Sequence, residues 1–215
     1  MSIVSGPMTE PNLDYYAATT EEADQLNNNL FACDIRQCER CPLHKERNVA
    51  CPGWFLSLPL DILFVGMSPG KDEDKAGRPF IGRAGKKLME LADSINLIKS
   101  DTMIGFTNVV RCHTPDNRPP TGQEIQACST WMRAELDMAE PKVVMLLGNS
   151  AIPLAFENKK IGQVAGSARA MGSTIYIACY HPAAILHKRS AVIQDSIVQS
   201  MKLAKEVLHE NRCHD

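Results

Sequence analysis

Residues 62–70 read ILFVGMSPG and decide how the chain is expected to fold. The run from Ile62 to Val65 is short and continuously apolar, which is typical of a buried strand. It ends in a turn where Gly66 and Gly70 let the backbone approach a ligand closely. In open α/β sheets, ligands bind beyond the carboxyl ends of the strands. The stretch therefore predicts an α/β fold with a site at this turn.

Other apolar runs alternate with helical patterns, which predicts a mostly parallel central sheet in an α/β fold. Capping-box pairs mark two helix starts, Thr19 with Glu22 and Thr121 with Glu124. Further strands are predicted at about 104–110, 143–147 and 175–180, the last forming a hairpin with its turn at 172–173. Helices are predicted at about 19–31, 85–97, from 121 and from 190, and loops at about 32–59 and 71–85.

Length and composition predict one globular domain, because 44% of the 215 residues are apolar. We expect this domain to span 33–210, after an N-terminal extension, 1–32, that carries a helix. The formal net charge of −2 gives no global basic field, so any DNA-binding face must be local. Basic residues do gather in loops, for example Arg111, His113 and Arg118.

Neither a secretory pattern nor a long apolar segment is apparent in the sequence, so we expect a cytoplasmic protein with no membrane contact and with reduced thiols. Four of the eight cysteines have the spacing of metal ligands. Cys38 and Cys41 form a C-x-x-C pair, and Cys112 and Cys128 are separated by fifteen residues. Two close thiolates with a distant pair predict a soft metal centre, and this ligand set alone fits either zinc or iron–sulfur.

Three segments are predicted to lie at the carboxyl ends of strands: GMSPG at 66–70, TNVVRC at 107–112 and YHP at 180–182. Because those ends meet at one edge of a parallel sheet, the three segments predict a single site.

With these motifs the chain resembles the iron–sulfur uracil-DNA glycosylases, usually called family 4, over about residues 36–208. The motifs are CERCPLHKER at 38–47, GMSPG with KDEDKAGRPFIGRAG at 66–85, TNVVRC at 107–112, NRPPTGQEIQAC at 117–128, PKVVMLLGNSA at 141–151 and YHPAAIL at 180–186. The resemblance implies a three-layer sandwich that acts, as a monomer, on uracil-containing DNA, single- or double-stranded. It also implies a structural [4Fe–4S] cluster on Cys38, Cys41, Cys112 and Cys128, with zinc as the alternative.

The resemblance assigns a base pocket to three side chains. Phe80 would stack on the flipped base, although a core phenylalanine is the alternative. Asn108 would bond the uracil edge, because an amide both donates and accepts. His181 would donate to uracil O2 and stabilise the departing base. The turn residues Gly66, Met67, Pro69 and Gly70 would line the same pocket.

The first motif departs from the family at Met67. Family 4 has G-E-x-P-G there, and methionine cannot replace the glutamate. GMSPG is closer to the GMNPG turn of the single-strand-selective glycosylases, in which the asparagine, at the position of Ser68, holds a water. Ser68 could hold a water but cannot act as a base. Two functions are therefore carried forward: a uracil-DNA glycosylase of reduced rate, and a glycosylase-fold module that binds DNA, a modified base or a replication partner without cleaving. A third reading, which the absorbance of an iron–sulfur centre near 400 nm would discard, is a zinc-bound α/β protein that processes nucleotides.

Overall fold

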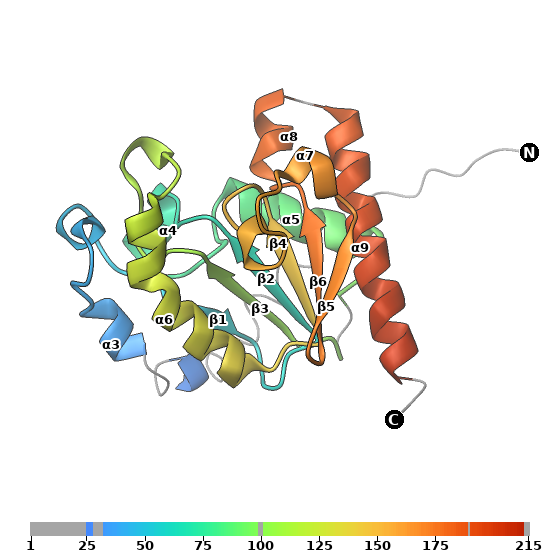
Figure 1. Ribbon diagram of the computed structural model, residues 1–215, viewed down its shortest axis with the longest axis horizontal. Coiled ribbons are helices and arrows are strands. Elements are labelled where there is room, and N and C mark those ends of the chain that lie inside the picture. The colour runs from blue at the N-terminus through green and yellow to red at the C-terminus, as the bar shows by residue number, and fades with distance from the viewer. Residues whose placement is uncertain (1–24, 28–31, 99–100, 189, 213–215) are drawn as a thin grey trace, which may run out of the picture.

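The structure is a computed structural model that describes residues 25–27, 32–98, 101–188 and 190–212. Its centre is a six-stranded sheet of order β1-β3-β2-β4-β6-β5 (Figure 1). The four inner strands, in the order β3-β2-β4-β6, run parallel to one another. The short outer strands are antiparallel to the inner strands that they pair with, β1 to β3 and β5 to β6. The bounds are β1 Trp54–Phe55, β2 Ile62–Gly66, β3 Ile104–Asn108, β4 Val143–Leu147, β5 Ala168–Met171 and β6 Thr174–Cys179.

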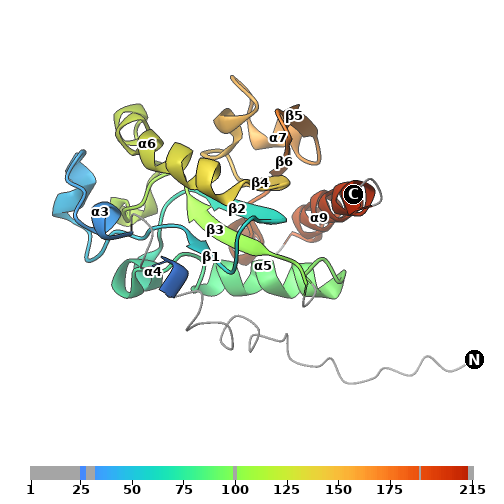
Figure 2. The same ribbon diagram turned by 90° about the horizontal axis from the view of Figure 1, so that it is seen from below.

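Helices cover both faces of the sheet, as Figure 2 shows with α5 on one side and α6 on the other. One face packs against α5 (Arg83–Ser94), α8 (Ala183–Lys188) and α9 (Ala191–Arg212), and the other against α6 (Gly122–Ala139), η3 (Ile152–Leu154) and α7 (Ile161–Val164). Side chains of β2 alternate between the two cores, with Phe64 in the first and Leu63 in the second. The predicted three-layer α/β sandwich is confirmed.

Several predicted elements are confirmed closely. The run 62–65 is β2, the run 143–147 is β4, and the hairpin turn at 172–173 joins β5 to β6. At the start of α6, Thr121 Oγ1 accepts from Glu124 N at 3.2 Å and Glu124 Oε2 accepts from Thr121 N at 2.7 Å, which is the predicted capping box. The helix expected at about 19–31 lies almost wholly outside the described residues.

Two loop predictions are wrong. Segment 71–85 contains α4 (Lys71–Ala76), whose acidic first turn complements the helix dipole and whose C-cap is Gly77 in the left-handed region, at φ 67°. Segment 32–59 contains α3 (Ala32–Arg36), η1 (Pro42–Lys45) and β1. These elements are too short to give a periodic signal. Within the described ranges, no helix is long and apolar enough to cross a membrane.

Candidate active site and metal centre

The three predicted segments meet at the carboxyl edge of the sheet. Gly66 ends β2 opposite Asn108 at the end of β3. A β-carbon on Gly66 would lie 2.5 Å from Asn108 Oδ1 and 2.8 Å from Phe80 Cζ, so only glycine fits between them. The Phe80 ring lies 6.2 Å from the His181 ring, centroid to centroid. The structure therefore brings Phe80 close to both Asn108 and His181.

Phe80 belongs to both the hydrophobic core and the candidate pocket. It is 8% exposed, and its ring centroid lies 5.4 Å from that of Phe106. Its backbone is left-handed, at φ 58°, a conformation that costs a bulky residue energy. A β-carbon on Gly85 would lie 1.7 Å from the Phe80 carbonyl oxygen. The first turn of α5 therefore holds Phe80 in place, and the core alternative for this residue is partly right.

His181 has a defined tautomer. Its Nδ1 atom accepts a hydrogen bond from the Ala183 backbone N–H at 3.2 Å, which places the ring proton on Nε2. Burial lowers the pKa of His181 from 6.5 to about 4, so the ring is neutral at physiological pH. Gly148, at φ 80°, packs against it, since a β-carbon there would lie 3.1 Å from His181 Cβ. His181 is thus a fixed, neutral N–H donor.

Asn108 is buried at 4% exposure, yet its side-chain amide makes no hydrogen bond to any other residue that the structure describes. An amide without a partner in the described part of the chain is available to a ligand with both acceptor and donor groups. Its backbone carbonyl accepts from the guanidinium of Arg111, which fixes the end of β3.

Arg111 was expected on a basic surface loop, and the structure corrects this. It is 1% exposed and pairs with the buried carboxylate of Glu135 on α6. Glu135 also accepts from Gly53 N at 2.8 Å and from Thr107 Oγ1 at 2.5 Å. Arg118 is likewise paired, with Glu124. The sequence analysis missed Glu135, because an acidic residue inside a helix usually faces solvent.

The turn after β2 carries the departure from the family pattern. Met67 is partly buried, and Val110 N donates to its carbonyl at 3.1 Å. Ser68 Oγ lies 3.1 Å from Thr114 Oγ1. The side chain of position 67 is thus a thioether where the family places an acid, and position 68 adds a hydroxyl.

The four predicted ligand cysteines line one cavity. Cys38, Cys41, Cys112 and Cys128 surround it together with Ile35, Arg47, Ala127 and Trp131. The other described cysteines lie elsewhere, Cys33 exposed and Cys51 and Cys179 buried. The four cysteines that the spacing predicted as ligands thus lie around one cavity in the structure.

Three N–H groups point at sulfur atoms in this cavity. Arg47 Nη1 donates to Cys112 Sγ at 3.1 Å, Trp131 Nε1 to Cys38 Sγ at 3.3 Å, and the Arg111 backbone N–H to Cys128 Sγ at 3.4 Å. Burial raises the pKa of the Cys112 thiol to about 11 and also raises that of Cys128. Burial thus opposes the thiolate form of these two cysteines, whereas the nearby N–H donors favour charged sulfur.

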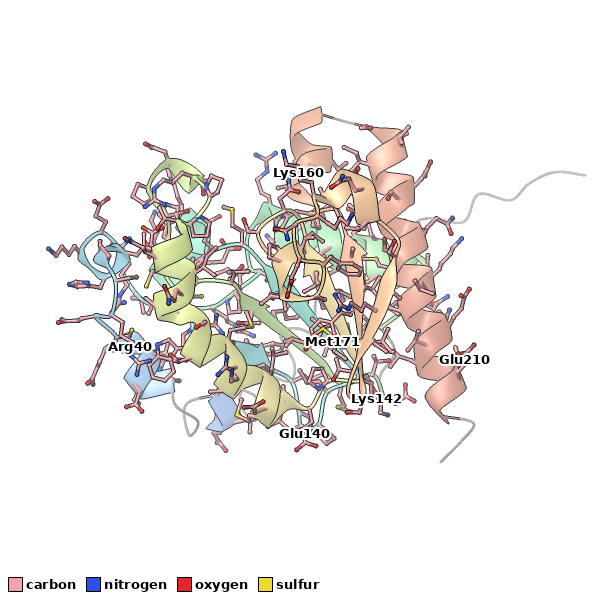
Figure 3. The ribbon with its side chains drawn as sticks, viewed as in Figure 1. Arg40, Glu140, Lys142, Lys160, Met171 and Glu210 are labelled. Atoms are coloured by element: carbon pink, nitrogen blue, oxygen red, sulfur yellow. The ribbon has the colours of Figure 1, made fainter. Side chains whose placement is uncertain are left out.

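The four cysteine sulfur atoms in this cavity are a donor set that suits either a zinc ion or an iron–sulfur cluster. A single zinc ion needs four sulfur atoms at about 2.3 Å from one point. Among the described residues, no three His, Cys, Asp or Glu side chains are arranged to hold one metal ion. A cluster binds each thiolate to a different iron. Arg40 covers the site from outside, its guanidinium 4.4 Å from the Trp131 ring centroid, at the edge of the molecule beside α3 (Figure 3).

The three-layer sandwich, with Phe80, Asn108 and His181 at the carboxyl edge of its sheet and a cysteine-lined cavity, defines the protein as an α/β protein of the open-sheet class. Comparison with known proteins makes the class specific. Residues 54–206 match the family model of the uracil DNA glycosylase superfamily, and the chain belongs to that superfamily.

Similar proteins include the type-4 uracil-DNA glycosylase of Thermotoga maritima, which is 34% identical over 81% of this chain and 91% of its own length. The type-4 uracil-DNA glycosylase of Archaeoglobus fulgidus is 38% identical over 72% of this chain and 81% of its own length. A DNA polymerase of Bacillus phage SP01 is 24% identical over 68% of this chain, a match that covers 16% of the polymerase.

Proposed function

We propose that this protein is a uracil-DNA glycosylase that hydrolyses the N-glycosidic bond of uracil flipped out of DNA. The observation that carries the proposal is the Asn108 side chain, which has no hydrogen-bond partner among the described residues and lies near the Phe80 ring, together with the neutral histidine donor His181. The similarity to type-4 enzymes supports the same substrate. The protein would act as a monomer inside the cell, on single- or double-stranded DNA.

The roles follow from the geometry. Phe80 supplies an aromatic face for the base, and Asn108 donates to one uracil carbonyl while accepting from the uracil N3–H. An amide so placed rejects cytosine, whose exocyclic amine is a donor where uracil has an acceptor. His181 Nε2–H donates to uracil O2.

When the C1′–N1 bond breaks, its electron pair leaves with uracil, and the donor at O2 stabilises the resulting anion. A water then adds to C1′ and releases a proton to solvent, and the uracil anion is protonated on release. A donor aimed at developing charge typically contributes about 10²–10³ in rate. No base is required for the first step, so this protein can cleave without an acid at position 67.

Cys38, Cys41, Cys112 and Cys128 would hold a [4Fe–4S] cluster, with zinc as the alternative. The cluster would supply the charge that keeps the buried thiolates together and would tie 38–47 to 111–128. Arg47 supports this, because it donates to Cys112 Sγ and also to the Cys38 carbonyl at 2.7 Å. Replacing any one of the four by serine should give colourless, poorly soluble protein.

The test is single-turnover cleavage of oligonucleotides that carry one uracil, with alkali to reveal abasic sites. The native protein should form abasic product from single- or double-stranded substrate. His181→Ala should lower the rate by about 10²–10³ with little change in DNA affinity. His209→Ala, on the exposed face of α9, is the matched control and should leave the rate unchanged. Equal loss of rate and affinity in His181→Ala would contradict the assigned role.

Met67 provides a second test. Met67→Glu should raise the rate without changing DNA affinity, because a carboxylate would act on the positive sugar or the attacking water. Met67→Gln has the same size without the charge and should not raise the rate. A rate that falls in Met67→Glu would mean that the new carboxylate disturbs a water held by a neighbouring group such as Ser68, and that it does not act on the sugar or the water itself.

The alternative function is a DNA-binding module that does not cleave. The absence of an acid at Met67 favours it, as does the likeness to part of a phage DNA polymerase. The two functions separate in the same experiment. If native protein, Met67→Glu and Ser68→Asn all bind uracil-containing DNA and none forms abasic product, the binding module is correct.

A further inference from the structure

The turn after β2 and the chain after β3 run alongside each other. Val109 N donates to the Gly66 carbonyl at 2.9 Å, and Val110 N donates to the Met67 carbonyl at 3.1 Å. Further along, His113 Nδ1 donates to the Pro69 carbonyl at 2.7 Å. The segment 109–113 thus binds the carbonyls of three residues of the turn, Gly66, Met67 and Pro69. Cys112, a proposed metal ligand, belongs to the same segment.

The fourth contact joins two side chains, Ser68 and Thr114, whose hydroxyl oxygens are 3.1 Å apart. Thr114 has no exposed surface. In the part of the chain that the structure describes, Ser68 is the one partner of the Thr114 hydroxyl. A buried hydroxyl proton needs an acceptor, so Thr114 donates and Ser68 Oγ accepts.

With Thr114 as the donor of this hydrogen bond, some hydrogen-bonding positions of the Ser68 hydroxyl remain free. A hydroxyl has one donor and two acceptor positions. With one lone pair occupied by Thr114, Ser68 keeps its own O–H and one lone pair. Ser68 is partly exposed at the turn, whereas Thr114 is buried. The O–H and the remaining lone pair of Ser68 are therefore available to a water.

We propose that Thr114 is a positioning residue that orients the Ser68 hydroxyl to hold the attacking water. The inference rests on the proposed glycosylase function and deepens it. The pair acts on position and not on protonation, because a serine hydroxyl is not a base at neutral pH. The water contributes its oxygen to C1′ after the C1′–N1 bond has broken and gives its proton to solvent. The hydroxyl pair would thus take over the placement of water where the family acid is replaced by Met67.

The test compares Ser68→Ala, Thr114→Val and the double variant in single-turnover cleavage. Thr114→Val keeps the size of the buried side chain and removes the hydroxyl. Each single variant should lower the rate by about threefold to tenfold, the typical effect of one hydrogen bond. The double variant should be no slower than Ser68→Ala, since the two groups act as a unit. Affinity for uracil-containing DNA should stay unchanged.

Two further variants separate positioning from folding. Thr114→Ser restores the hydroxyl and should recover most of the rate that Thr114→Val loses. Thr174→Val is the matched control, because Thr174 Oγ1 also donates a hydrogen bond, to the Pro141 carbonyl at 2.8 Å, at the opposite end of the sheet. It should cleave at the native rate.

The inference is overturned if native protein cleaves and Thr114→Val cleaves equally fast, or if the effects of the single variants multiply in the double variant. Absence of cleavage by native protein would instead refute the proposed function. A crystal structure with DNA carrying 2′-fluoro-deoxyuridine, which resists hydrolysis, tests the pair without turnover. We expect an ordered water bonded to Ser68 Oγ in the native protein and not in Thr114→Val. A native complex without that water would also overturn the inference.

Discussion

Glu135→Gln should destabilise the protein strongly, although it removes no volume. The carboxylate is 1% exposed and accepts from Arg111, from Gly53 N and from Thr107 Oγ1. Glutamine leaves the guanidinium of Arg111 buried without a counter-charge. Its amide also directs a donor at groups that are themselves donors. Removing one partner of a buried ion pair typically costs about 3–5 kcal/mol.

That cost is large against a total stability of about 5–15 kcal/mol. With a urea slope of about 2 kcal/mol/M, a loss of about 4 kcal/mol lowers the unfolding midpoint by about 2 M. The assay is urea unfolding followed by circular dichroism and by visible absorbance, because coincident transitions test whether protein and metal centre unfold together.

Glu90→Gln is the matched control, since Glu90 forms an exposed ion pair with Lys87 on α5. Exposed pairs contribute about 0–1 kcal/mol, so its midpoint should move by less than about 0.5 M. If Glu135→Gln shifts the midpoint no more than Glu90→Gln does, then Arg111 is not held by a charge in the folded protein and the reasoning is refuted.

Three more outcomes are expected. Burial lowers the pKa of His181 to about 4 in the folded protein, so as pH drops from 6.5 towards 4 the unfolded chain takes up a proton that the folded protein does not. The free energy of unfolding should therefore fall over this range, and it should fall less in His181→Gln. If the urea midpoints of the native protein and His181→Gln change equally with pH, this prediction is wrong. Gly85→Ala should displace Phe80 and cost about 1–3 kcal/mol, measured as a lower Tm, and an unchanged Tm would exclude the close approach. Cys128→Ser should lose visible absorbance while Cys51→Ser retains it; the reverse would mean that the ligand set is wrong.

The parallel core of the fold could be predicted because its signals are local. The runs at 62–65 and 143–147 are apolar without interruption, and Thr121 with Glu124 marks the start of α6 within four residues. Short elements such as α4 were missed, because six residues do not establish a period.

The contacts that shape the site could be predicted less well, since they join residues far apart in sequence. Glu135 lies 24 positions from Arg111, and Thr114 lies 46 positions from Ser68. Neither residue has a motif of its own, and both acquire their roles only when the chain folds. The segments 66–70, 107–112 and 180–182 could be predicted to meet because each lies at the end of a strand, whereas the roles of Phe80, Asn108 and His181 were taken from the family resemblance.

The contacts that hold Phe80 and His181 explain why a changed residue in the GMSPG turn need not disturb either side chain. Phe80 is held from α5 through Gly85, and His181 is held through the Ala183 backbone. Neither depends on the side chain at Met67. The side chains proposed to recognise uracil and to stabilise its anion are therefore held in place by contacts that do not involve position 67. Substitution at position 67 should change the rate of hydrolysis without changing which base is bound, and a variant there that altered base preference would show that the two functions share a residue.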